Sequence, residues 1–325
     1  MQEAFEDGML EWLDQCPACG ASDGDEYIRA HDMVYGCSSR LWKYSMCEYC
    51  GSLYLSPRPS EQYIEKAYAS YHTHNSGEGV LGASTKKILS LYLDQGVMAG
   101  ILWIIVTLIF PIRLYLDAKS RGIKYISQGK VLDYGCGDGV FLSLCNTKKL
   151  LAYGTDFDPE AVREARKSGA FVEQGGYEIV KKMSAKEFDL VTISHVIEHV
   201  YNLDELLSEC YRVLKPGGYL WLETPNPNAK GLRVFKENWR GLEPPRHLVL
   251  FSRHVLISKL KKLGFISVKE KYHFFSALYM YLVSIRLQKK SVGICVLVRA
   301  LFRDIVGLFS NCDSEFITIK CQKKF

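Results

Sequence analysis

The sequence predicts a doubly wound α/β domain, in which helices cover both faces of a parallel sheet. Short apolar runs alternate with amphipathic helical patterns over roughly residues 122–272. The first of these runs ends in an acid and a glycine-rich turn, the pattern of a strand-to-helix ligand loop. There is room for additions, because 325 residues exceed one ordinary domain and the 48% hydrophobic content can fill a sizeable core.

The glycine-rich turn follows the first predicted strand, where residues 131–142 read VLDYGCGDGVFL and Asp133 ends the strand. The turn contains Gly135, Gly137 and Gly139. Glycines at alternate positions let the backbone bend sharply and let a ligand lie against its amides. A dinucleotide fingerprint has its third glycine one residue later, where this chain has Val140. The spacing favours a nucleoside cofactor without a diphosphate; an ordinary tight turn is the alternative reading.

Three further strands follow in order. Residues 151–155 form an apolar run that ends at Asp156, about 20 residues after the first glycine, where an acid can hold both ribose hydroxyls. Residues 188–194 read as a buried parallel strand that ends at Ser194. Residues 214–218 (LKPGG) precede another strand at 219–223.

This set of motifs resembles the class I S-adenosylmethionine-dependent methyltransferases, particularly the branch with HVIEHV at residues 195–200, LKPGG, and TPN at residues 224–226. The resemblance covers roughly residues 122–272 and the last strand. It implies a seven-stranded, mostly parallel sheet, S-adenosylmethionine as the cofactor, and methyl transfer as the activity.

The resemblance also implies roles for individual residues. Asp133 and the three glycines should hold the amino-acid part of the cofactor, Asp156 the ribose, and Phe157 one face of the adenine. We also expect Ser194 to bind the cofactor. The family's usual acidic contact to adenine is not evident after the third strand.

Three histidines are candidate catalytic groups. His195 and His199 follow the strand that ends at Ser194, so they lie at the sheet edge where ligands bind. Together with His247 they could act as a general base toward a hydroxyl acceptor, and we rank His247 first. Packed or capping histidines are the alternative. Residues 195–199 also match the H-x-x-E-H pattern of a metalloprotease class, which we reject because the methyltransferase resemblance accounts for the segment.

Two C-x-x-C pairs, each followed by glycine, predict a structural zinc site near the amino terminus. The expected ligands are Cys16, Cys19, Cys47 and Cys50. Redox dithiols are the alternative, and His31 or Cys37 could substitute as ligands, although we expect both to be structural. Four thiolates complete the shell, so no position remains for a catalytic water.

The predicted domain organisation has three parts. Residues 10–56 form a zinc-ribbon module whose small core makes the metal a main source of folding free energy. Residues 57–121 form a helical linker with an apolar segment at 97–112, and residues 122–325 form the methyltransferase domain with an apolar insertion at 274–310.

The loop after the strand at 219–223 has the composition of an acceptor pocket, with Trp239, Arg240, Arg246 and His247 among prolines. A rigid structural loop is the alternative. Both apolar segments have basic edges or flanks, and we expect them to form a platform on an anionic cytoplasmic leaflet. Extra core, a dimer contact, or a membrane span remain open.

The leading functional hypothesis is methyl transfer to an oxygen of a glycan or a lipid-linked isoprenoid acceptor in polysaccharide or quinone biosynthesis. The absence of a signal-peptide pattern favours a cytoplasmic protein, peripheral on the inner face of the membrane. An RNA methyltransferase is the first alternative, which the modest net charge of +5 disfavours. The second alternative is a non-catalytic scaffold docked on a membrane. Such a scaffold would be expected to have a damaged glycine turn or to lack the ribose-binding acid, whereas this sequence keeps both.

Overall fold

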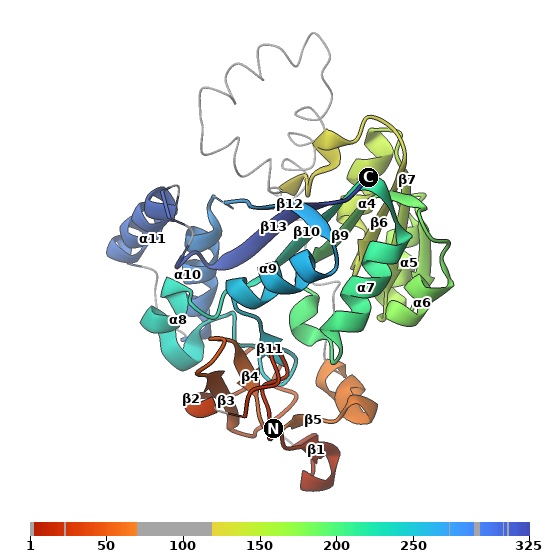
Figure 1. Ribbon diagram of the computed structural model, residues 1–325. Helices are drawn as coiled ribbons and strands as arrows, with labels where there is room; N and C mark the ends of the chain where they lie inside the picture. Colours follow the sequence, from red (N-terminus) through yellow and green to blue (C-terminus); the bar gives the residue numbers. More distant parts are fainter. Residues whose placement is uncertain are drawn as a thin grey trace.

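The computed structural model describes residues 3–22, 24–69, 119–272, 274–288, 293–307, 309–310 and 312–325. The apolar segment at 97–112 lies outside these ranges, and so does most of the linker predicted at 57–121. A seven-stranded sheet forms the centre of the molecule, in the order β12-β13-β10-β9-β6-β7-β8 (Figure 1). Its strands are β6 (Lys130–Tyr134), β7 (Leu151–Asp156), β8 (Phe171–Gln174), β9 (Phe188–Ser194), β10 (Leu214–Pro225), β12 (Phe265–Glu270) and β13 (Phe316–Lys323).

The strand directions confirm the predicted doubly wound, mostly parallel sheet. β6, β7, β8, β9 and β10 are parallel to one another, and β13 runs antiparallel to both β10 and β12. The LKPGG segment, expected as a turn, is included in β10, whose register with β9 shifts between Leu214 and Tyr219. Because parallel strands end at one edge, the carboxyl ends of β6, β7 and β9 meet there.

Helices cover both faces of this sheet. They are α4 (Val140–Thr147), α5 (Pro159–Arg166), α6 (Tyr177–Lys182), α7 (Leu203–Val213) and α9 (Arg253–Lys262). Buried residues of α4 and α5 belong to one core cluster, while those of α6, α7 and α9 belong to another. The predicted N-cap of α9 is confirmed, because the Ser252 hydroxyl accepts a hydrogen bond from the Val255 amide.

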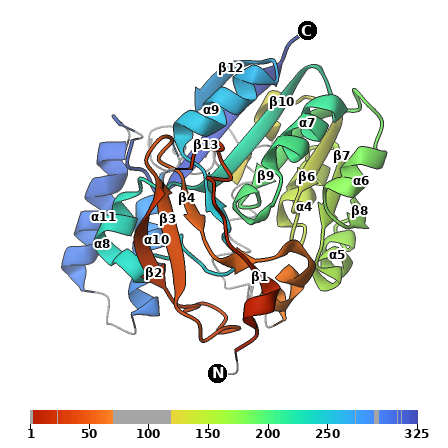
Figure 2. The same cartoon turned by 60° about the horizontal axis from the view of Figure 1, so that its bottom comes forward.

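The amino-terminal ribbon forms a separate sheet, shown from below in Figure 2. Its strands are β2 (Gly24–Ala30), β3 (Trp42–Cys47), β4 (Leu53–Leu55) and β11 (Val249–Leu250), in the order β11-β4-β3-β2. A two-stranded sheet joins β1 (Leu10–Glu11) to β5 (Arg58–Pro59). Because β11 comes from the carboxyl-terminal half, the ribbon sheet includes a strand from outside the module predicted at residues 10–56.

The insertion predicted at 274–310 contains two helices, α10 (Ser276–Leu287) and α11 (Ile294–Gly307), beside α8 (Lys230–Phe235). Short 3-10 helices complete the fold. They are η1 (Asp7–Met9), η2 (Glu61–Tyr68), η4 (Ile123–Tyr125), η5 (Ile197–His199) and η6 (Lys236–Asn238). Within the ranges that the structure describes, no helix combines the length and apolar character needed to cross a bilayer.

Tyr44 joins the ribbon to the loop that precedes β11. Its side chain is fully buried, and its hydroxyl contacts two main-chain carbonyls, those of Leu242 and His247, the latter at 3.0 Å. We predict that Tyr44→Phe lowers the free energy of unfolding by about 1–3 kcal/mol, because buried carbonyls lose their donor. Urea unfolding measures this change. The exposed-site variant Tyr49→Phe is the control, and equal stabilities for the two variants would contradict the prediction.

Candidate cofactor and acceptor site

The glycine loop lies between β6 and α4. The space around its glycines differs from one position to the next. Each has a positive φ, between 53° and 79°. A Cβ on Gly139 would lie 2.7 Å from the Cα of Ala165, so this glycine permits close contact between the loop and α5. A Cβ on Gly137 would meet nothing within 4 Å. The backbone at Gly137 therefore faces open space, as a ligand cradle requires.

Asp156 ties the end of β7 to this loop. Its carboxylate accepts hydrogen bonds from the amides of Gly137 at 2.8 Å and Asp158 at 3.0 Å. Burial raises the pKa of Asp156, although these hydrogen bonds oppose the shift. Phe157 follows with its ring half exposed, and the ring of Tyr68 meets it edge-on at 4.6 Å between centroids.

Asp133 lies below the loop and is fully buried. Its carboxylate accepts hydrogen bonds from the guanidinium of Arg121 at 3.0 and 3.1 Å and from the Thr192 hydroxyl at 2.5 Å. Burial raises its pKa, while Arg121 acts in the opposite direction. Asp133 therefore reaches the surface of the site through the partly exposed Arg121 rather than directly.

His195 lies between two buried carboxylates at the ends of β9 and β10. Its Nδ1 is 3.5 Å from Glu198, and its Nε2 is 3.3 Å from Glu223. Partial burial disfavours the charged ring, yet the two carboxylates outweigh it and raise the pKa of His195 to about 9. At neutral pH this side chain is a hydrogen-bond donor and a positive charge, so it does not serve as the general base considered from the sequence.

His199 and His247 form a pair, with ring centroids 4.7 Å apart. His199 Nδ1 lies 3.0 Å from the Arg246 carbonyl, and His247 Nδ1 lies 2.7 Å from the Gly241 carbonyl. A carbonyl only accepts, so each Nδ1 carries the proton and each Nε2 keeps its lone pair. Burial lowers the pKa of both rings, which are neutral at pH 7.

Glu198 adds a carboxylate to the histidine pair. It is fully buried, with Oε2 accepting from the Thr224 hydroxyl at 2.8 Å and Oε1 without a hydrogen-bond partner among the described residues. Burial opposes its charge, but the protonated His195 ring lowers the pKa of Glu198 to about 2. Glu198, His199 and His247 each offer a ligand atom within 4.8 Å of the others, so the cluster can accept a proton or a cation.

The loop before β11 packs against the interior. This corrects the prediction that its polar and aromatic residues together line an acceptor pocket. Trp239 and Arg246 are fully buried, and the Trp239 indole donates to Glu315 at 2.8 Å. His247 is also buried, whereas His199 is partly exposed. For Trp239 and Arg246 the structure agrees with the alternative of a rigid loop.

Comparison with known proteins identifies the domain that carries this site. Residues 112–270 match the family model described as a methyltransferase domain. The sheet order, the open glycine loop and the acid at the end of β7 agree with that match. The chain contains a class I S-adenosylmethionine-dependent methyltransferase domain.

Curated relatives of the methyltransferase domain include the ubiquinone biosynthesis O-methyltransferase of Thiobacillus denitrificans. It is 33% identical over 130 residues, which are 37% of this chain and 53% of the relative. The mitochondrial enzyme of that name from Mus musculus is 32% identical over 149 residues, 40% of this chain and 39% of the relative. The chain thus spans about half the length, or less, of these two relatives.

Solved structures similar to this chain include an S-adenosylmethionine-dependent methyltransferase from Archaeoglobus fulgidus. Its TM-score is 0.47 at 26% identity, over 67% of this chain and 99% of that one. Phosphoethanolamine N-methyltransferase 2 from Haemonchus contortus has a TM-score of 0.49 at 15% identity, over 93% of this chain and 69% of that one.

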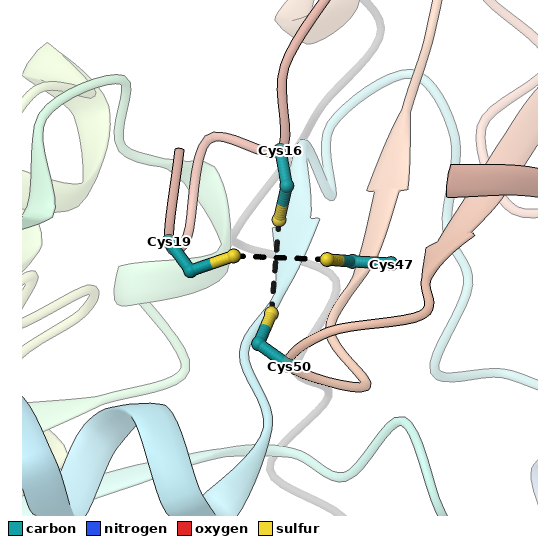
Figure 3. Close-up of side chains that lie close together, drawn as sticks. All are labelled: Cys16, Cys19, Cys47 and Cys50. Carbon is teal, nitrogen blue, oxygen red and sulfur yellow. Dashed lines mark hydrogen bonds between the residues drawn. The ribbon is translucent and has the colours of Figure 1, made fainter. Parts of the chain in front are cut away.

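Four cysteines that precede the methyltransferase domain in the chain point their sulfurs toward one another, as the two C-x-x-C pairs predicted (Figure 3). The sulfurs of Cys16 and Cys50 are 3.7 Å apart, and those of Cys19 and Cys47 are 3.6 Å apart. Tetrahedral zinc with Zn–S bonds near 2.3 Å requires about 3.8 Å between sulfurs, so the thiolates fit this ion. His31 and Cys37 are not members of the cluster, and none of the eleven cysteines forms a disulfide.

Two residues at the methyltransferase site were missed in the sequence. Tyr68, at the end of η2, contacts Phe157 and lies 3.3 Å from His199 through its hydroxyl. Arg121 precedes β6 and adopts a positive φ of 41°. Neither belongs to a motif, and each reaches the site through tertiary packing, so the sequence carried no signal for them.

We predict that Asp156→Ala weakens binding of S-adenosylmethionine about 30-fold, because the loop loses a carboxylate with two amide hydrogen bonds, worth about 2 kcal/mol together. Calorimetric titration of the zinc-replete protein measures the dissociation constant. Glu173→Ala on β8 is the control, since that side chain is exposed. Unchanged affinity in a folded Asp156→Ala protein would refute the prediction that S-adenosylmethionine binds at the carboxyl end of β7.

Proposed function

We propose that this protein transfers a methyl group from S-adenosylmethionine to an oxygen of a lipid-linked glycan or isoprenoid acceptor at a membrane surface. The observation that carries the proposal is one sheet edge with two halves. An open glycine loop follows β6 and is tied to the end of β7, and a neutral histidine pair joins the segment after β9 to the loop before β11.

The cofactor half fits S-adenosylmethionine because the backbone at Gly137 is open and acidic groups flank it. The segment with Gly135, Gly137 and Gly139 would hold the amino-acid part of the cofactor, with Arg121, held by Asp133, available to its carboxylate. Asp156 would bind the ribose, and Phe157 with Tyr68 would contact the adenine. Ser194, at the end of β9, would complete the cofactor site.

The acceptor half supplies proton handling and orientation. Bound S-adenosylmethionine supplies an electrophilic methyl group on a sulfonium. His199 accepts the proton of the acceptor hydroxyl at Nε2, because it is neutral and more exposed than His247, which packs behind it. His195, charged and fixed by Glu198 and Glu223, orients the acceptor oxygen. Most of the remaining rate enhancement comes from alignment and exclusion of water.

An oxygen acceptor is supported by the names of the curated relatives, which are O-methyltransferases of ubiquinone biosynthesis. An apolar, anionic acceptor is supported by α11, where four apolar side chains at helical spacing are exposed. These are Val298, Leu301, Phe302 and Ile305. A cavity of about 430 Å³ between α8, α10 and α11 continues this stripe and includes Lys230, Arg299 and Arg303 in its lining. Apolar side chains with basic neighbours suit an anionic lipid surface.

The cysteine cluster is proposed as a structural zinc site. The thiolates converge at distances that fit a closed tetrahedral shell, and three of the four cysteines are buried. In this role the ion holds the two knuckles of the ribbon together and takes no part in methyl transfer.

We predict that Cys47→Ser reduces bound zinc well below one ion per chain and lowers the free energy of unfolding by about 4 kcal/mol or more, as loss of a structural metal does. Metal analysis and urea unfolding measure the two effects. Cys295→Ser, at an exposed cysteine outside the cluster, is the matched control. Full zinc content in the Cys47 variant would overturn the proposed ligand set.

We predict that the wild type floats with anionic liposomes and transfers labelled methyl groups to a polyprenyl-linked glycan or a quinol held in them. Leu301→Glu with Phe302→Glu should lower both signals about tenfold, because two exposed apolar side chains that enter the lipid surface contribute about 1.4 kcal/mol or more to binding. Trp12→Glu is the control at an exposed apolar residue elsewhere. If the protein does not float with vesicles and methylates RNA transcripts instead, the result would contradict this proposal and favour the RNA methyltransferase hypothesis.

A further inference from the structure

Arg246 is a fully buried cation in the loop before β11, where this loop packs against the ribbon. Its guanidinium forms two hydrogen bonds with the Asp32 carboxylate, at 2.7 and 3.3 Å, and one with Glu243 at 3.0 Å. It also donates to the Ala67 carbonyl at 3.0 Å, and its centre lies 4.3 Å from the centroid of the Tyr35 ring. Three separate segments thus fix one side chain.

The main chain of this same residue controls the histidine pair. The Arg246 carbonyl accepts the hydrogen bond from His199 Nδ1, and the next residue is His247. The His247 carbonyl is in turn held by the hydroxyl of Tyr44 from the ribbon. Groups of the amino-terminal ribbon therefore hold residues 246 and 247, while the rings themselves also contact the Tyr68 hydroxyl, 3.3 Å from His199 Nδ1, and the Gly241 carbonyl.

We propose that Arg246 is a positioning residue for methyl transfer, through which Asp32 of the ribbon fixes His199 in the Nδ1-protonated tautomer. With the carbonyl in place, the Nδ1 proton has an acceptor and the Nε2 lone pair is available to an acceptor hydroxyl. When the carbonyl moves, the ring can rotate or exchange its proton to Nε2, and the lone pair no longer faces the site. The kinetic part of this inference rests on the proposed function.

The ribbon should act on transfer and not on cofactor binding. The hydrogen bonds that shape the cofactor loop join Gly135, Cys136 and Gly137 to β7, and none of them involves the ribbon. Arg246 also meets η2 at the Ala67 carbonyl, next to Tyr68, so Asp32→Asn, which keeps this donor in place, is the cleaner variant. Loss of the ion pair between Arg246 and Asp32 therefore leaves the loop intact while the general base loses its orientation.

The first test is spectroscopic and needs no methyl acceptor. Nitrogen-15 NMR of the zinc-replete full chain at pH 8 distinguishes the two neutral tautomers, with the rings assigned through His199→Gln and His247→Gln. We expect both wild-type rings to be protonated at Nδ1, and His199 to become a mixture of tautomers in Asp32→Asn. Wild-type rings protonated at Nε2 would overturn the proposal even when every variant fails to fold.

The second test separates cofactor binding from turnover. In Asp32→Asn and Arg246→Lys we expect turnover to fall about 10²-fold, the scale of a lost general base, while in Asp32→Asn the dissociation constant for S-adenosylmethionine changes less than about twofold. The matched control is Glu11→Gln, which breaks another ion pair of the ribbon, with Arg58. The same turnover loss in the control, or normal turnover and tautomer in a folded Asp32→Asn protein, would refute positioning. Failure of the wild type to bind S-adenosylmethionine would instead refute the proposed function.

Discussion

The buried ion pair between Arg246 and Asp32 is the interaction on which the surroundings of the histidine pair depend. A guanidinium without solvent is tolerable only when its charge and its donors are matched, and Asp32, Glu243 and the Ala67 carbonyl match them. Satisfying one cation brings together the ribbon, the end of η2 and the loop before β11. The histidine pair lies at their meeting point, so its geometry follows from this pairing.

The site around the glycine loop depends on a different constraint. The parallel strands β6 and β7 end at the same edge of the sheet. Asp133 and Asp156 end neighbouring strands, and each carboxylate has a separate use. Asp133 neutralises Arg121 below the loop, whereas Asp156 holds the loop amides above it. The two regions meet at Tyr68, which touches Phe157 and His199. A residue from the amino-terminal part therefore connects the glycine-loop edge to the histidine pair.

The sequence predicted those features whose causes are local. The glycine spacing, the acid after each early strand and the two C-x-x-C pairs act within a few residues of the chain, so their patterns were readable. The roles of Arg246 and Trp239 were misread, because a polar or aromatic residue on a proline-rich loop looks the same whether it faces solvent or core. The protonation of His195 could not be predicted either, since it depends on Glu223, a residue on another strand.

The strand exchange between the two halves also constrains how the chain can be assembled and divided. During synthesis β4 emerges almost 200 residues before β11 and has an unpaired outer edge until β11 arrives. A fragment that stops after the ribbon keeps this edge exposed and can join the edges of other copies. Any transfer of this ribbon onto another catalytic domain would have to supply a replacement for β11.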